Sequence, residues 1–438
     1  MTSTVHIDVH HLTRVEGHGN IVVNVTDGVV ETCEWQVPEA PRFFESMVRG
    51  RHYSEVGRIT SRICGICAVG HTLASVKATE EALGIAISEQ SRKLRELLKH
   101  AENADSHVLH AYILVAPDLA GAPSVFALVE TMPDVVARAL RLKRLCHEWG
   151  SLIGGRTTHP TTVVPGGMAE VPTDKQLEEL KQKLVAAVPD VEATVETVVA
   201  LAPNIPAFDR PTEYVALSND ENYAVYDGQV QSVLADGAKQ RYRVADYRQV
   251  TNEFVVPQST AKYTKNKLES YAAGALARFN NNDDMLVPEA KQAAEALGLR
   301  PICTNPYMNT VAQVVEVVHS VYDSLRLIDE LLDAGVRLEP LAEPTKHGSG
   351  AQAVEVPRGI LFHEYEYDAG GICHGGNCII PTNQNHNNIQ HDFDVLVPQL
   401  LEADKSEAEM ELALSMLVRA YDPCISCSTH CLDVKFVR

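Results

Sequence analysis

Two C-x-x-C pairs stand near opposite ends of this chain of 438 residues: Cys64 with Cys67, and Cys424 with Cys427. The spacing lets two thiolates face one metal ion across a single turn, and two such pairs are typical of a tetrathiolate site, most often structural zinc. In zinc ribbons the pairs lie about 15–20 residues apart, whereas almost the whole chain separates these two. The pattern therefore predicts a large domain whose ends meet around a buried metal, with nickel, iron and zinc all open.

The composition is that of an acidic globular protein. Apolar residues make up 45% and charged residues 22%, and the formal net charge is -20, which disfavours binding to nucleic acid and to anionic membranes. We expect no membrane span, because no stretch approaches about 18 uninterrupted apolar residues. The first residues lack the basic start and apolar segment of a secretory signal. Ten cysteines are too few for a disulfide scaffold, so their clustering favours metal or redox chemistry in a reducing compartment, and we expect the cytoplasm.

Hydrophobic periodicity predicts a predominantly helical α+β fold, a single large catalytic domain over 1–438 in which a central helical bundle carries small peripheral β-sheets. Helical patterns cover the segments 72–112, 132–152, 174–199, 267–278, 289–297, 310–334 and 406–421. Pro189 is expected to kink or end the third of these helices.

Strand patterns are fewer. Asp27 and Gly28 between two apolar runs predict a β-hairpin region over 19–37, and residues 211–260 form a predicted β-rich insertion. The glycine-rich segment 354–381 is expected to be irregular, and His386 and His391 are placed in a loop. The chain has no G-x-G-x-x-G or P-loop motif, which argues against a bound nucleotide.

The residues around the cysteines make the pattern more specific. Residues 62–71 form R-x-C-G-x-C-x-x-x-H, and residues 422–430 form D-P-C-x-x-C-x-x-H. Residues 14–18 form R-x-E-G-H, 357–359 form P-R-G, and 381–383 form P-T-N. In this order and at these distances, over about residues 10–430, the set resembles the large subunit of [NiFe]-hydrogenases.

That resemblance implies a nickel–iron centre. Cys64 and Cys424 would be terminal nickel ligands, and Cys67 and Cys427 would bridge nickel to an iron that also carries carbon monoxide and cyanide. Thiolates suit soft metals, and an open coordination position would admit dihydrogen.

Cleaving dihydrogen heterolytically releases a proton that needs a base. The candidates are the Cys424 thiolate and the guanidine of Arg358. Since arginine is normally always protonated, a charge clamp for an anionic cluster is an equal alternative for Arg358. Glu16 matches the family's proton gate, and its alternative role is a salt bridge with Arg14 or the stabilisation of a turn.

A second ion is also implied. Glu45 and His430 match ligands of a buried magnesium or iron ion, and the carbonyl of Cys378 is a weaker third candidate.

Four further residues are expected near the centre. Thr382, after Pro381, would donate a hydrogen bond to an iron-bound cyanide or serve as an ordinary turn hydroxyl. His71 would tune a bridging sulfur, and Asp422 would hold Arg358.

The resemblance also implies partners. No cysteine set remains for iron–sulfur clusters, so electrons would leave through an iron–sulfur small subunit, followed by a further electron-transfer module. That module would use NAD(P), a deazaflavin coenzyme or a heterodisulfide-linked route. Residues 431–438 resemble a C-terminal extension that a maturation protease removes after nickel-insertion factors have acted. Ser106 and residues 379–390 resemble the cytosolic, cofactor-coupled branch.

Two other interpretations stay open. One is an electron-transfer subunit like the quinone-site subunit of respiratory Complex I, which shares this fold but lacks the four cysteines. The other is a scaffold held by structural zinc. The nickel-to-iron ratio of the protein separates both from a hydrogenase.

Overall fold

A computed structural model describes residues 4–429. Its helices are α1 (Phe44–Met47), α2 (Tyr53–Thr60), α3 (Ala68–Leu83), α4 (Glu89–Leu109), α5 (Ala116–Leu119), α6 (Val125–Thr131), α7 (Pro133–Gly154), α8 (Asp174–Leu201), α9 (Arg248–Thr251), α10 (Ala275–Asn282), α11 (Pro288–Ala296), α12 (Asn309–Ala334), α13 (Pro381–Glu402) and α14 (Glu407–Ala420). Its strands are β1 (Val5–Val9), β2 (Asn20–Thr26), β3 (Val29–Gln36), β4 (Val163–Val164), β5 (Gly167–Met168), β6 (Glu213–Ser218), β7 (Gln229–Leu234), β8 (Lys239–Tyr242), β9 (Tyr271–Ala272), β10 (Gly348–Val356), β11 (Gly359–Tyr367) and β12 (Cys373–Ile379). The expected α+β fold with a helical centre and small sheets is confirmed.

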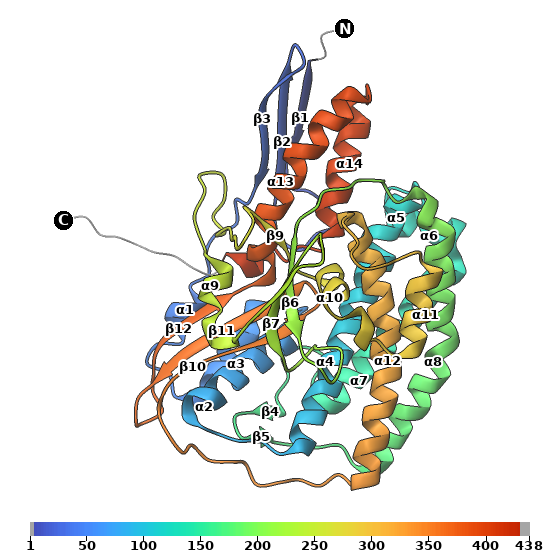
Figure 1. Cartoon of the computed structure of the whole chain (residues 1–438). Helices are drawn as coiled ribbons and strands as arrows, with labels where there is room; N and C mark the ends of the chain where they lie inside the picture. The colour runs from blue at the N-terminus through green and yellow to red at the C-terminus, as the bar shows by residue number, and fades with distance from the viewer. Residues whose placement is uncertain (1–3, 430–438) are drawn as a thin grey trace, which may run out of the picture.

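The body of the molecule is a bundle of the long helices α4, α7, α8 and α12 (Figure 1). Helix α4 packs against α7 and α12, and α8 packs against both of these as well. Buried polar pairs link α4 and His110, the residue directly after it, to α12 at matched steps: His110 with Gln313, His107 with Glu316 and His100 with Asp323. Along these pairs the residue numbers fall on the α4 side and rise on the α12 side, so the two helices are antiparallel. The pairs also fix the register between them.

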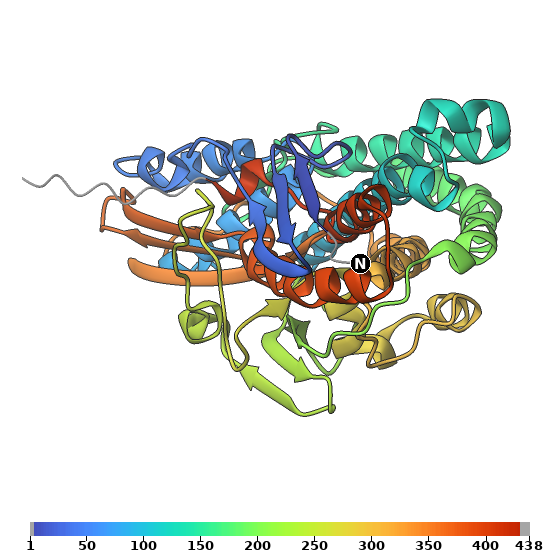
Figure 2. The same ribbon diagram turned by 90° about the horizontal axis from the view of Figure 1, so that it is seen from above.

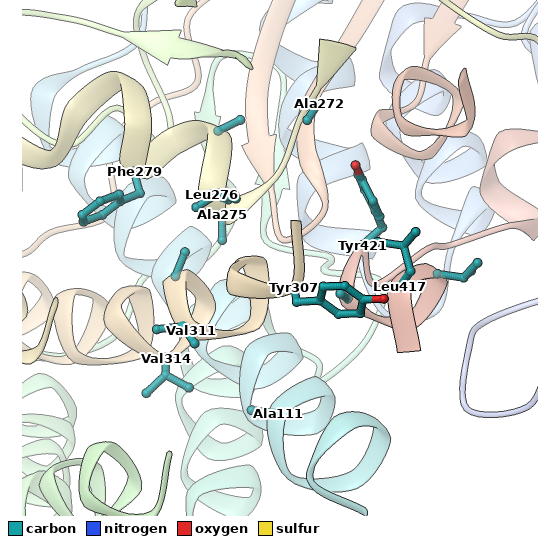
Figure 3. Packing of buried hydrophobic residues seen from close by; sticks show 14 of the residues in the cluster. Ala111, Ala272, Ala275, Leu276, Phe279, Tyr307, Val311, Val314, Leu417 and Tyr421 are labelled. Atoms are coloured by element: carbon teal, nitrogen blue, oxygen red, sulfur yellow. The ribbon is translucent and has the colours of Figure 1, made fainter. Parts of the chain in front are cut away.

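An apolar seam joins the C-terminal helix α14 to this bundle. Figure 3 shows Leu417 of α14 and Tyr421, directly after this helix, in the same buried cluster as Leu276 of α10 and Val311 and Val314 of α12. Burying these side chains stabilises the docked position of α14. The segment that carries the second cysteine pair starts directly after this anchored helix.

Residues 348–379 form a three-stranded antiparallel sheet in the order β10-β11-β12, with α3 packed on it. The expectation that 354–381 is irregular is therefore wrong. Glycine serves close packing here: a Cβ atom on Gly350 of β10 would lie 2.3 Å from the backbone nitrogen of Ala82 in α3. Sequence patterning treats such a glycine as a strand breaker, although it lets helix and sheet approach.

The N-terminal sheet has the order β1-β2-β3, and β2 and β3 pair on either side of Asp27 and Gly28. The sequence pattern had not indicated β1. Strand β3 contacts α13 and β1 contacts α14, so this sheet lies beside the last two helices (Figure 2). Strands β6, β7 and β8 lie within residues 211–260, and β9 adds a parallel strand to β6.

Three helix predictions need correction. Helix α8 does not end at Pro189 but runs on to Leu201, and buried residues such as Leu184 and Val191 lie on both sides of the proline. The predicted helix 267–278 begins only at Ala275, after the short strand β9 and the left-handed Gly274. The helical region 72–112 is two helices that Gly84 separates with a φ of 63°.

His386 and His391 were expected in a loop, and both lie on α13. Among residues 4–429, no helix is both long enough and apolar enough to cross a bilayer.

We expect Gly350→Ala to lower the free energy of unfolding by about 2 kcal/mol or more, because overpacking against a backbone leaves little room to relax. Gly375→Ala on β12 is the matched control, since nothing lies within 4 Å of its added Cβ. Urea unfolding followed by circular dichroism measures both. Equal stability of the two variants would show that the helix–sheet contact is loose.

Candidate metal centre

The two cysteine pairs meet in the interior. The four sulfur atoms of Cys64, Cys67, Cys424 and Cys427 all lie within 4.8 Å of one another, and all four residues are buried. The Sγ atoms of Cys64 and Cys424 are 3.5 Å apart. The expected convergence of the two chain ends is therefore confirmed.

Local structure aims each pair inward. Cys67 directly precedes α3, and the backbone N–H groups of Ile66 and Cys67 both donate to the Cys64 sulfur at 3.2 Å. The second pair follows α14 through Asp422, whose φ of 50° turns the chain sharply. Both pairs are thus held by short segments next to a rigid helix.

The N-terminal segment holds the second pair in place. Ile425 N–H donates to the Glu16 carbonyl at 2.9 Å, and Glu16 N–H donates to the Pro423 carbonyl at 3.4 Å. Gly17 follows, and a Cβ there would lie 2.8 Å from the backbone nitrogen of Ser426. The R-x-E-G-H motif therefore needs glycine where two chain segments press together.

The protonation of the four thiols is uneven. A hydrogen bond with Cys424, together with those from Cys427 and Cys67, lowers the pKa of the Cys64 thiol. Burial raises the pKa of the Cys424 and Cys427 thiols. Four buried thiolates would repel one another without a cation, so this donor set fits a metal centre and not an empty pocket.

Arg358 stands next to the cluster in the turn between β10 and β11. Its Nη2 donates to Asp422 Oδ1 at 2.9 Å, and its Nη1 donates to Ser106 Oγ at 3.3 Å. Burial alone would lower its pKa, but Asp422 and the cysteines raise the pKa of Arg358 above its ordinary value. Its Nε–H is buried with no acceptor among the described residues. This spare donor fits an anionic metal group beside the thiolates.

Glu16 reaches the cluster directly. Its Oε2 accepts hydrogen bonds from Cys424 Sγ at 3.1 Å and from Ser426 N–H at 3.1 Å. The alternative of a salt bridge with Arg14 is wrong, because Arg14 pairs with Asp118 at 2.5 Å. The alternative of a turn-stabilising role stays open, because the Glu16 carboxylate also accepts from Ser426 Oγ in the turn of the second cysteine pair. A carboxylate in contact with a candidate ligand thiol can exchange a proton with it.

Thr382 and His71 lie close to the cysteine segments. Thr382 Oγ1 accepts from Cys424 N–H at 3.0 Å, and Pro381 is the first residue of α13. His71 lies one turn after Cys67 on α3, with its Nδ1 3.3 Å from Nε2 of His363.

The residues expected at a second ion are placed only in part. Glu45 Oε1 accepts from the backbone N–H of Cys378 at 2.8 Å. This contact uses the N–H of Cys378, whereas the expected ligand was its carbonyl. His430 lies outside the described residues.

Sequence reasoning missed several supports of the site. Arg42 donates from its Nη2 to the Ile63 carbonyl at 2.7 Å and also bonds the Ser426 carbonyl, so it joins the two cysteine segments. Gln313 donates to Asp422 at 3.1 Å, and Asn383 donates to the Ser428 carbonyl at 2.9 Å. Only the position of Asn383 within the P-T-N motif could have indicated its role.

The comparison with known families decides what kind of centre this is. The family model described as "Nickel-dependent hydrogenase" matches residues 42–128 and 255–430. The chain belongs to the nickel-dependent hydrogenases. The chain is therefore a hydrogenase large subunit, an oxidoreductase, and its four clustered cysteines are positioned to bind a metal centre.

Related proteins agree over nearly the full length. The hydrogenase chain is 32% identical to the alpha subunit of sulfhydrogenase 1 of Pyrococcus furiosus, with 97% of each chain covered. It is 32% identical to one subunit of the F420-non-reducing hydrogenase of Methanothermobacter marburgensis, with 98% of this chain and 95% of the relative covered. Its fold matches the crystal structure of an NAD+-reducing [NiFe]-hydrogenase in the H2-reduced state with a TM-score of 0.88 at 26% identity, covering 97% and 99% of the two chains.

We expect Cys424→Ala to lose nickel at least tenfold while the chain stays folded, because one of four sulfur donors is removed from a buried set. Cys146→Ala is the control, a buried cysteine of α7 outside the cluster. Elemental analysis of both purified variants measures the effect. Normal nickel content in Cys424→Ala would contradict the ligand assignment.

Proposed function

We propose that this chain is the catalytic subunit of a [NiFe]-hydrogenase that cleaves dihydrogen reversibly and heterolytically to protons and electrons. The observation that carries the proposal is the 3.1 Å contact between the Cys424 thiol, inside the four-sulfur cluster, and the Glu16 carboxylate. It places a proton acceptor against a metal-binding sulfur. In this proposal Cys64 and Cys424 hold nickel, and Cys67 and Cys427 bridge it to iron.

When bound, the nickel–iron centre supplies the position at which dihydrogen is polarised and its electrons are accepted. The residues of this chain handle the proton. The Cys424 sulfur accepts it, and Glu16 Oε2, at hydrogen-bond distance, receives it from sulfur. Ser426 N–H, also on Oε2, keeps the carboxylate aimed at the thiol.

Arg358 acts as the charge clamp in this mechanism and not as the base. Its raised pKa and its ion pair with Asp422 keep the guanidinium protonated at every step. A permanent cation beside the thiolates offsets part of their negative charge.

Thr382, at the start of α13, would donate a hydrogen bond from its hydroxyl to a cyanide on iron, since its oxygen already accepts a hydrogen bond from Cys424 N–H. The iron would also carry carbon monoxide. His71 would tune a bridging sulfur. Glu45, His430 and the carbonyl of Cys378 would hold a magnesium or iron ion.

Electrons would leave to an iron–sulfur small subunit, and exposed cations close to the first cysteine pair in sequence support this partner. Arg58 of α2 and Arg62, two residues before Cys64, are both exposed. On a chain with a net charge of -20, exposed cations beside the cysteine segment suit an acidic partner surface.

Both relatives are named as single subunits of their hydrogenases, which supports a multi-subunit enzyme. We propose a further electron-transfer module that delivers electrons to a soluble acceptor such as NAD(P). We also propose a cytoplasmic location, and assembly by nickel-insertion factors and a protease that removes residues 431–438.

Metal and infrared analysis of the purified complex tests the proposed function. We expect nickel in the complex, iron in excess of nickel because the iron–sulfur partner also carries iron, and infrared bands from iron-bound carbon monoxide and cyanide. Zinc alone would support a structural scaffold, and a protein without these bands would exclude the proposed centre.

We expect Glu16→Gln to reduce hydrogen oxidation about 100-fold or more, because the amide cannot accept the proton. Nickel and iron should be retained, since Glu16 binds neither metal in this proposal. Glu31→Gln, an exposed glutamate on β3, is the control. Dye-coupled hydrogen oxidation with metal analysis on the same samples makes the measurement, and full activity of Glu16→Gln would remove Glu16 from the proton route.

A further inference from the structure

A chain of hydrogen bonds runs from the N-terminal sheet to the turn that carries Cys427. Trp35 Nε1–H, from β3, donates to His386 Nδ1 at 2.9 Å. His386 Nε2 lies 2.9 Å from Ser428 Oγ, and Ser428 Oγ donates to the Ile425 carbonyl at 2.6 Å. Neither Trp35 nor His386 belongs to the cysteine cluster itself.

The direction of each bond follows from the chemistry of the groups. An indole N–H can only donate, so His386 Nδ1 is an acceptor and carries no proton. Burial lowers the pKa of His386 to about 3, so the ring is neutral at physiological pH and its single proton sits on Nε2. Nε2–H therefore donates to Ser428 Oγ, which leaves the hydroxyl proton for Ile425.

The last bond closes the turn around a candidate bridging ligand. Ile425 carbonyl accepts from both Ser428 Oγ–H and, at 3.0 Å, Ser428 N–H. Cys427 lies between these two residues in the short helical turn Ser426–Ser428. The Ser428 hydroxyl therefore adds a second bond to the turn that carries the Cys427 sulfur.

The imidazole is also held by its surroundings. Tyr263 stacks on the His386 ring with centroids 6.0 Å apart and planes 28° apart, and its hydroxyl donates to the Trp35 carbonyl at 3.2 Å. His386 and Trp35 are completely buried. One tautomer and one ring orientation are thus fixed by neighbours on three separate segments of the chain.

We propose that His386 is a positioning residue for Cys427, holding that sulfur in the place from which it would bind the metal centre. The inference rests on the proposed nickel–iron centre. His386 touches no reacting atom and acts through Ser428. The tie to Trp35 makes the N-terminal sheet part of the support of a C-terminal metal ligand.

The experiment compares four variants in the complete hydrogenase complex. His386→Leu removes both hydrogen bonds, and His386→Gln offers an acceptor and a donor in the same place. Trp35→Phe removes only the indole donor and frees the second tautomer. Trp149→Phe is the matched control, because Trp149 is equally buried and its Nε1 has no partner among the described residues.

In His386→Leu we expect the carbon monoxide and cyanide bands to shift and kcat to fall about tenfold, with KM and thermal stability close to those of the unaltered complex. His386→Gln should restore the band positions in large part, Trp35→Phe should broaden or split the bands, and Trp149→Phe should leave them in place. If His386→Leu does not assemble, the infrared bands of Trp35→Phe are compared with those of Trp149→Phe, which makes the same test.

Unshifted bands in both His386→Leu and Trp35→Phe, with nickel retained, would overturn the inference and leave the proposed function intact. Equal shifts in Trp35→Phe and Trp149→Phe would also overturn it, because a general effect of core changes would then explain the result. An unaltered complex without carbon monoxide and cyanide bands would refute the proposed function, and the inference with it.

Discussion

The backbone pairing of residue 16 with residues 423–425 is the contact on which the rest of the site depends. It lays the C-terminal segment beside the N-terminal one and holds the second cysteine pair in place, while Arg42 joins that pair's segment to Ile63 beside the first pair. Burying four thiols and an arginine costs free energy, and the bundle and its docked helix α14 offset that cost. A large helical body is therefore what allows so small a cluster to be held without disulfide bonds.

Buried charge around the cluster is balanced pair by pair. Arg358 is matched by Asp422, and deeper in the bundle Arg278 is shared by Glu316 and Glu355. Pairing of this kind makes each ion strongly dependent on its partner, since removing one leaves the other uncompensated in a poorly solvated interior. The metal centre extends the same arrangement, because four thiolates call for a cation as their partner.

The helices and the metal site were predictable from sequence for different reasons. Long apolar stripes, as in α12 and α14, are local signals that survive into the fold. The cysteine pairs were predictable because two thiolates do not complete a tetrathiolate metal site, so a second pair is expected beside the first however many residues separate them. The sheet β10-β11-β12 was missed because glycines such as Gly350 serve a close approach that only the tertiary structure shows. Pro189 misled because the packing of α8 outweighs one lost backbone hydrogen bond.

The contacts that support the site were the least predictable. Arg42, Gln313 and His386 act through partners far away in sequence, and no local pattern marks them. By contrast, Glu16 stands in a motif, yet only the structure separates its contact with Cys424 from the rejected pairing with Arg14. Site residues are therefore accessible from sequence where chemistry or motif singles them out, and inaccessible where only geometry does.

X-ray absorption at the nickel edge of the purified complex tests the central claim most directly, because it reports the atoms around nickel itself. The account predicts a nickel ion coordinated by sulfur with an iron neighbour across bridging sulfurs. Nickel surrounded by nitrogen and oxygen alone, with no iron beside it, would contradict it.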